Sequence, residues 1–118
     1  VSDEHDLIQE TVGDLLERES VDVVVTNGGT GVTPDDVTPE AVRPLLDKPL
    51  PGFGELFRQL SYDEIGTMVV GTRAVGGVAE GVPIFVLPGS TNAVELGVSE
   101  IIIPEVGHLA GLARRDGD

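Results

Sequence analysis

The sequence predicts an α/β fold with a mostly parallel sheet, because two short apolar runs alternate with helical patterns. Residues 22–26 and 83–87 are rich in Val, Ile and Leu and lack the polar alternation of a half-exposed strand. Such runs are typical of strands that helices cover on both faces. Each run ends in a glycine-containing turn and is followed by a helical pattern, which favours a layered domain of βαβ type.

The segment before the first strand has the spacing of an amphipathic helix. Leu7, Val12 and Leu16 fall on one face, and acidic residues occupy the opposite face. Ser2 or Asp3 is placed to cap this helix, and acids in the first turn suit the positive end of the helix dipole.

A second helix is predicted to begin at the Thr-Pro-Glu sequence 38–40. Thr38 is its predicted N-cap, and Pro39 fits the first helical position because a proline there loses no intrahelical hydrogen bond. Pro44 should end or bend this helix. A third helix is expected from near Gly52.

The remaining elements follow from glycine, proline and apolar runs. Residues 73–81 predict an irregular strand and turn, and a helix should follow Ser90. A further helix is expected over residues 104–114, after the apolar residues 101–103.

Length, charge and cysteine content limit the functions that the chain can have. The 118 residues are the usual size for one domain, with residues 113–118 as a polar tail. The net charge of −14, from 21 acidic and 7 basic residues, disfavours nucleic acid and anionic membranes as partners. No run approaches the ~20 consecutive apolar residues of a membrane span. The absence of cysteine excludes disulfides and fits a cytoplasmic protein.

Two further features concern the origin of the chain. Many acids beside a single lysine, Lys48, are typical of adaptation to a saline cytoplasm, as in a halophilic archaeon. An ordinary acidic protein is the alternative. The first residue is not Met, and we expect that the native protein has residues before it.

The two glycine turns predict a phosphate site. Residues 26–31 and 88–90 each follow a strand, and turns after neighbouring parallel strands meet at one edge of the sheet. Glycines let backbone N–H groups approach an anion closely. Arg73 is a candidate phosphate partner. The alternative is that each turn is only a tight connection and that Arg73 is a surface or ion-paired side chain.

Acidic residues near this turn raise the question of a metal. Asp36 follows the first turn closely, and Asp3 begins the helix that leads into the first strand. Mg²⁺ would offset the repulsion between carboxylates and phosphate by binding oxygens of both. In a chain with 21 acids, ordinary surface carboxylates are the competing interpretation.

Four blocks in the sequence together resemble the MoaB/MogA group of molybdenum cofactor biosynthesis proteins. They are residues 26–31 (TNGGTG), 34–41 (PDDVTPEA), 51–55 (PGFGE) and 87–90 (LPGS). The resemblance runs from Asp3 to about Leu112 and implies a three-layer α/β domain that assembles as a trimer or hexamer. It also implies that the family's N-terminal strand, helix and following strand are missing from this chain.

The resemblance implies a nucleotidyltransferase, molybdopterin adenylyltransferase. In this reaction the phosphate of molybdopterin attacks the α-phosphorus of ATP, with Mg²⁺, and pyrophosphate leaves. It assigns catalysis and Mg²⁺ binding to Asp3 and Asp36. The expected substrate-binding residues are Thr26, Asn27, Gly28, Gly29, Thr30, Gly31, Glu55, Arg73, Pro88, Gly89 and Ser90.

The sequence departs from the family pattern after the second glycine turn. Thr91 and Asn92 stand where members commonly have Pro-Lys, so a positive charge near the expected phosphate site is missing. Two alternatives therefore remain open. One is a molybdopterin- or nucleotide-binding or scaffold protein without catalysis, and the other is a CinA-like nucleotide pyrophosphatase.

Overall fold

The computed structural model describes residues 3–113 and has an α/β architecture. Its helices and strands, in chain order, are α1 (Asp3–Leu16), β1 (Val24–Asn27), α2 (Thr38–Val42), η1 (Arg43–Leu45), β2 (Lys48–Pro49), α3 (Pro51–Ile65), η2 (Gly66–Gly71), β3 (Val75–Ala79), β4 (Val82–Leu87), α4 (Thr91–Gly97), η3 (Val98–Ile102) and α5 (Ile103–Ala113). The α/β class is confirmed. The predicted polar tail lies outside the described residues from position 114 onward.

The four strands of the described chain form a mixed sheet in the order β1-β4-β3-β2. Only β1 and β4 pair in parallel, whereas β3 pairs antiparallel with both β4 and β2. The prediction of a mostly parallel sheet is therefore corrected. The reason is a hairpin: Glu80 and Gly81 have φ angles of 51° and 79°, and such a two-residue turn returns the chain antiparallel.

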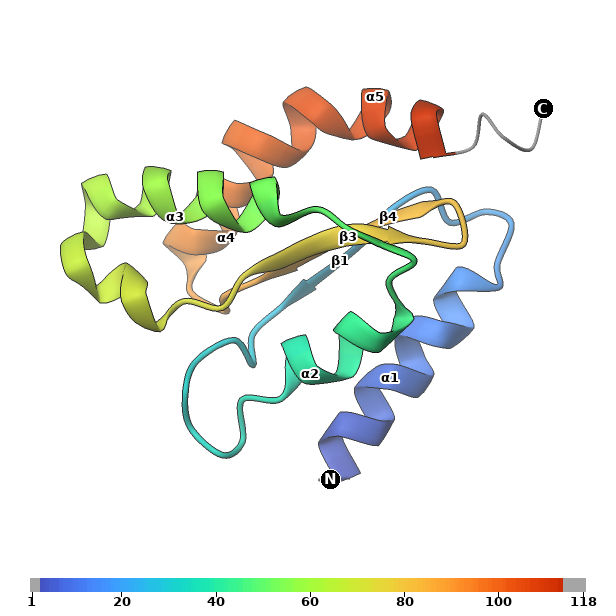
Figure 1. Cartoon of the computed structure of the whole chain (residues 1–118), viewed down its shortest axis with the longest axis horizontal. Helices are drawn as coiled ribbons and strands as arrows, with labels where there is room; N and C mark the ends of the chain where they lie inside the picture. The colour runs from blue at the N-terminus through green and yellow to red at the C-terminus, as the bar shows by residue number, and fades with distance from the viewer. Residues whose placement is uncertain (1–2, 114–118) are drawn as a thin grey trace.

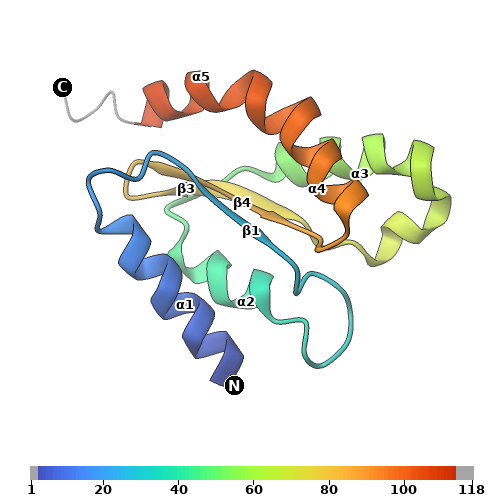
Figure 2. The same ribbon diagram turned by 180° about the vertical axis from the view of Figure 1, so that it is seen from behind.

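The central strand β4 joins two hydrophobic cores. All six of its residues are buried. Ile84 and Val86 pack in one core with α1 and α2, whereas Phe85 and Leu87 pack in the other with α3 and η3. Figures 1 and 2 show α1 and α2 on one side of the sheet and α3 and α5 on the other. The predicted three-layer arrangement is confirmed.

The predicted second helix is present but begins differently. Val37 is the capping residue, without a side-chain hydrogen bond, and Thr38 is already helical. Thr38 is buried, and its backbone N–H donates to the carbonyl of Gly29, 3.1 Å away. The prediction of Thr38 as N-cap is wrong because this side chain packs against the glycine turn. The effect of Pro44 is confirmed, since α2 ends at Val42 and continues as the 3₁₀ turn η1.

The last helical run, from α4 through η3 to α5, covers one face of the sheet. Ile101 and Ile102 are buried in the core that contains Leu87. By length and composition, the run Thr91–Ala113 could cross a membrane. The sequence prediction considered only unbroken runs of apolar residues. By mean hydropathy over a helix, its expectation that no segment could span a membrane is corrected. A helix that covers a sheet meets the same criterion, so we draw no membrane role from it.

Phe85 should be a main contributor to stability. Its side chain is 1% exposed, and its ring centroid lies 4.9 Å from that of Phe53. We expect Phe85→Ala to lower the free energy of unfolding by about 3–5 kcal/mol, since it leaves a cavity in a closed core. Val32→Ala, at a side chain 76% exposed, is the control and should change it by less than about 0.5 kcal/mol. Urea unfolding measures both, and equal effects would contradict this account of the core.

Candidate phosphate-binding site

The two glycine turns lie against one another at the end of the parallel strand pair. Asn27 is in register with Leu87, and the next backbone N–H, that of Gly28, donates to the carbonyl of Leu87 at 2.8 Å. Gly89 lies so near that a Cβ on it would be 3.3 Å from Cα of Gly28. The prediction that the two turns share one edge of the sheet is confirmed.

The first turn needs glycine for two separate reasons. Gly28 and Gly29 have φ angles of +102° and +70°, which side-chain-bearing residues rarely adopt. A Cβ on Gly29 would also lie 2.1 Å from Oγ1 of Thr38, inside any tolerable contact distance. The turn is therefore fixed both by its backbone conformation and by the first residue of α2.

The segment after this turn holds the carboxylate of Asp36. The backbone N–H and the hydroxyl of Thr33 donate to Oδ2 of Asp36 at 3.0 and 2.7 Å. The hydroxyl hydrogen bond is the largest of the causes that lower the pKa of Asp36 below its usual value. A Cβ on Gly31 would lie 2.7 Å from the same oxygen, so Gly31 leaves room for it. Asp36 is thus a charged, partly exposed carboxylate next to the glycine turn.

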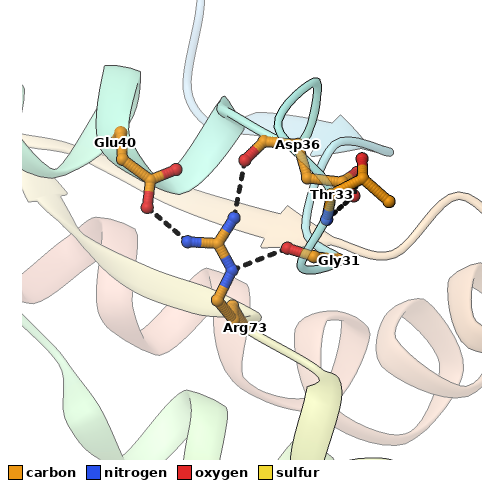
Figure 3. A network of polar contacts seen from close by, with 5 residues as sticks. All are labelled: Gly31, Thr33, Asp36, Glu40 and Arg73. Atoms are coloured by element: carbon orange, nitrogen blue, oxygen red, sulfur yellow. Dashed lines mark hydrogen bonds and ion pairs between the residues drawn. The ribbon is translucent and has the colours of Figure 1, made fainter.

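Arg73 is held by protein groups around this segment (Figure 3). Its Nε donates to the carbonyl of Gly31 at 2.8 Å, its Nη2 donates to the carbonyl of Asp36 at 2.6 Å, and its Nη1 pairs with the carboxylate of Glu40. The hydrogen bond from Arg73 is the largest of the causes that lower the pKa of Glu40. The sequence left open whether Arg73 is a phosphate partner or an ion-paired side chain, and in the structure it is ion-paired with Glu40. Sequence reasoning did not find Thr33 or Glu40.

Two hollows adjoin the glycine turn. One, of about 350 Å³, is bounded by Thr33, Asp36, Glu40 and Arg73 among others. The other, of about 400 Å³, lies between α1 and the end of β1 and is lined by Thr26, Asn27 and Thr38 together with side chains of α1. Oγ1 of Thr26 is buried and has no hydrogen-bond partner within the described residues. Thr26 and Asn27 of the first turn therefore line the second hollow, whereas polar residues of the segment after the turn line the first.

The predicted metal ligands are only partly described. Asp3 is the first residue of α1, the helix that lines the second hollow, and its side chain lies outside the described residues. Among the residues that the structure describes, no three His, Asp or Glu side chains gather closely enough to hold a metal ion. A magnesium site that uses Asp3 and Asp36 stays a prediction.

The other predicted binding residues lie in different places. Thr30 is buried, and Ser90 caps α4 by accepting a hydrogen bond from the backbone N–H of Ala93 at 3.2 Å. Glu55 is exposed on α3 and lines a separate groove of about 310 Å³ with Arg43 and Arg58. The structure therefore does not bring Glu55 into the hollow around Asp36.

Comparisons with known proteins identify the family of this chain. Residues 1–108 match the protein family described as "Probable molybdopterin binding domain". This chain belongs to that family. It is 50% identical over 110 residues to molybdenum cofactor biosynthesis protein B of Halalkalibacterium halodurans. The aligned residues are 92% of this chain and 65% of the relative. The chain thus spans about two thirds of the length of that relative.

Solved structures in the family have the same fold. The crystal structure of a molybdenum cofactor biosynthesis protein B superposes with a TM-score of 0.92 and 48% identity, over 98% of this chain and 72% of that one. The tungsten cofactor synthesizing protein MoaB from Pyrococcus furiosus gives a TM-score of 0.81 and 48% identity, over 91% of this chain and 69% of that one. The resemblance found in the sequence blocks is confirmed.

The lowered pKa values of Asp36 and Glu40 predict a pH dependence of stability. A carboxyl whose pKa is lower in the folded state than in the unfolded chain contributes stability above its ordinary pKa, 3.8 for Asp36 and 4.5 for Glu40. That contribution is lost as the pH falls through the folded-state value. We expect Asp36→Asn and Glu40→Gln to lower Tm at pH 7 and to approach wild type at pH 3. A Tm difference that is constant from pH 7 to pH 3 would contradict this.

Proposed function

We propose that this domain is a molybdopterin adenylyltransferase, which transfers AMP from Mg²⁺-ATP to the phosphate of molybdopterin. The observation that carries the proposal is the contact of the two glycine turns beside the charged carboxylate of Asp36. Backbone N–H groups at such turns are suited to bind phosphate oxygens. Membership of a molybdenum cofactor biosynthesis family supports the choice of the second substrate.

The described residues offer one suitable ligand for a divalent cation, the ionised carboxylate of Asp36. Mg²⁺ prefers oxygen ligands and commonly uses one or two carboxylates together with substrate phosphates. Asp36 supplies an ionised carboxylate whose Oδ2 is held by Thr33. Asp36, with Asp3, would hold Mg²⁺, and the cation would supply charge neutralisation at the phosphates.

The chain's own groups then have distinct tasks. The turn over residues 28–31 would hold ATP phosphates through its N–H groups, and Pro88, Gly89 and Ser90 would line the neighbouring side. In the transfer an oxygen of the molybdopterin phosphate bonds to the α-phosphorus of ATP. The bond from this phosphorus to the bridging oxygen breaks, and pyrophosphate leaves. The role of the protein is to align these groups and to offset their negative charge.

One observation favours a second candidate, a binding or scaffold protein without catalysis. Thr91 and Asn92 are exposed at the start of α4, where the resemblance leads one to expect a lysine. A weaker positive field there would leave phosphate binding to backbone groups and the cation. The discriminating result is binding of molybdopterin without release of pyrophosphate.

We further propose that the protein is cytoplasmic and works as a homo-oligomer, a trimer or a hexamer. Several large apolar side chains are exposed on the described surface, including Met68 at 74% and Val70 at 86%. Exposed apolar groups that gather on a surface are typical of protein interfaces.

The central variant is Asp36→Asn, tested by pyrophosphate release with ATP, Mg²⁺ and molybdopterin at high potassium chloride. Asparagine keeps an oxygen for Thr33 but removes the charge, so we expect turnover to fall at least about a hundredfold. Asp14→Asn, on the exposed side of α1, is the matched control and should keep full activity. Activity of Asp36→Asn within twofold of wild type would contradict the mechanism.

A further inference from the structure

Arg73 closes the loop that carries Asp36. Its guanidinium contacts the carbonyls of Gly31 and Asp36, which are the two ends of the 31–36 segment (Figure 3). Its backbone N–H also donates to the carbonyl of Thr30 at 3.2 Å. Arg73 is more than 35 positions from this loop in the sequence and contacts it at three residues, Thr30, Gly31 and Asp36.

Side chains of α2 and α3 in turn hold Arg73 and the backbone on both sides of it. Glu40, in the first turn of α2, pairs with Arg73. Arg58, on α3, donates to the carbonyls of Thr72 and Ala74, each at 3.4 Å. These carbonyls belong to the residues on both sides of Arg73, so the backbone from which Arg73 extends is itself held.

The contacts of Arg73 make it a poor phosphate ligand and a good clamp. The carboxylate of Glu40 offsets its charge, and the Arg73 side chain is 28% exposed. A guanidinium presents its donors in a rigid plane, which suits several fixed acceptors at once, whereas a lysine ammonium is a point charge that cannot reproduce this geometry.

We propose that Arg73 is a positioning residue: with Glu40 as its partner, it holds the 30–36 loop so that the carboxylate of Asp36 stays aligned with the glycine turn. The inference rests on the proposed phosphate chemistry of this turn, but the clamp itself can be tested without substrate. Loss of the clamp leaves part-buried carbonyls without their donor and frees the loop to move.

The test compares Arg73→Lys, Arg73→Met and Glu40→Gln with wild type. Hydrogen exchange is measured by mass spectrometry on the free protein, and kcat and KM for Mg²⁺-ATP are measured by pyrophosphate release. We expect exchange of the 30–37 amides to accelerate at least tenfold in all three variants, while exchange in β4 is unchanged. We expect kcat to fall roughly tenfold to a hundredfold, and more than KM rises, because Asp36 is displaced from its working position. Arg18→Lys, at an exposed position after α1, is the matched control and should change neither quantity.

Glu40→Gln separates positioning from direct binding of phosphate. If Arg73 is a clamp, this variant loosens the loop and lowers kcat. If Arg73 binds phosphate directly, removal of its counter-charge should instead tighten Mg²⁺-ATP binding in calorimetry, and that result would overturn the proposal. Unchanged loop exchange in both Arg73 variants would also overturn it. If wild type releases no pyrophosphate, the proposed function fails, and loop exchange alone decides whether Arg73 is a clamp.

Discussion

The site depends on one hydrogen bond that extends the pairing of β1 and β4 beyond the strands. The Gly28 N–H donates to the Leu87 carbonyl at 2.8 Å, one residue after the last paired positions. This bond ties the turn after β1 to the turn after β4, and it does so at a glycine with a φ of +102°. Because β4 is buried along its whole length, the bond joins the loop to a strand in the interior of the domain.

Beyond this hydrogen bond, further contacts hold the loop between β1 and α2. Thr38 packs against Gly29, Thr33 holds the carboxylate of Asp36, and Arg73 holds the backbone at Gly31 and Asp36. Each contact removes freedom from a segment that has no regular secondary structure between β1 and α2. The ordering cost is met by local hydrogen bonds, which is the usual way in which a loop is prepared for a ligand.

In a strongly acidic protein, the proposed phosphate site needs a specific way to attract an anion. Backbone N–H groups attract an anion without a basic side chain. A cation bound by both carboxylate and phosphate oxygens would turn the repulsion between these two groups into a net attraction. Arg73, which contacts the backbone of Asp36, is already paired with Glu40. The arrangement is consistent with a site that depends on backbone geometry more than on the net charge of −14.

The sequence was informative wherever a pattern was local. The runs 22–26 and 83–87 and their turns predicted the parallel pair and the shared edge, because apolar periodicity and glycine placement are short-range signals. The strand β3 and the turn after it lie within residues 73–81, which the sequence predicted as an irregular strand and turn, although Gly76 and Gly77 disfavour strands. The strand forms because neighbouring side chains occupy the space beside its glycines. A Cβ added to Gly76 would lie only 2.8 Å from the Cβ of Phe53.

The contacts of the site could not be predicted in the same way. Arg73 meets Gly31, Asp36 and Glu40 across more than 30 residues of chain, and no spacing rule connects them. Thr38 had the sequence signature of a helix cap, yet its burial against Gly29 decided its role. The family resemblance placed Asp36 in the site, whereas only the structure showed what holds it there.

The most direct test of this account is an NMR titration of the ¹⁵N-labelled protein with Mg²⁺-ATP. If the two turns form one phosphate-binding edge, the largest amide shifts should occur together at residues 28–31 and at Gly89 and Ser90. Shifts confined to one turn, or centred on the groove lined by Arg43, Glu55 and Arg58, would contradict it.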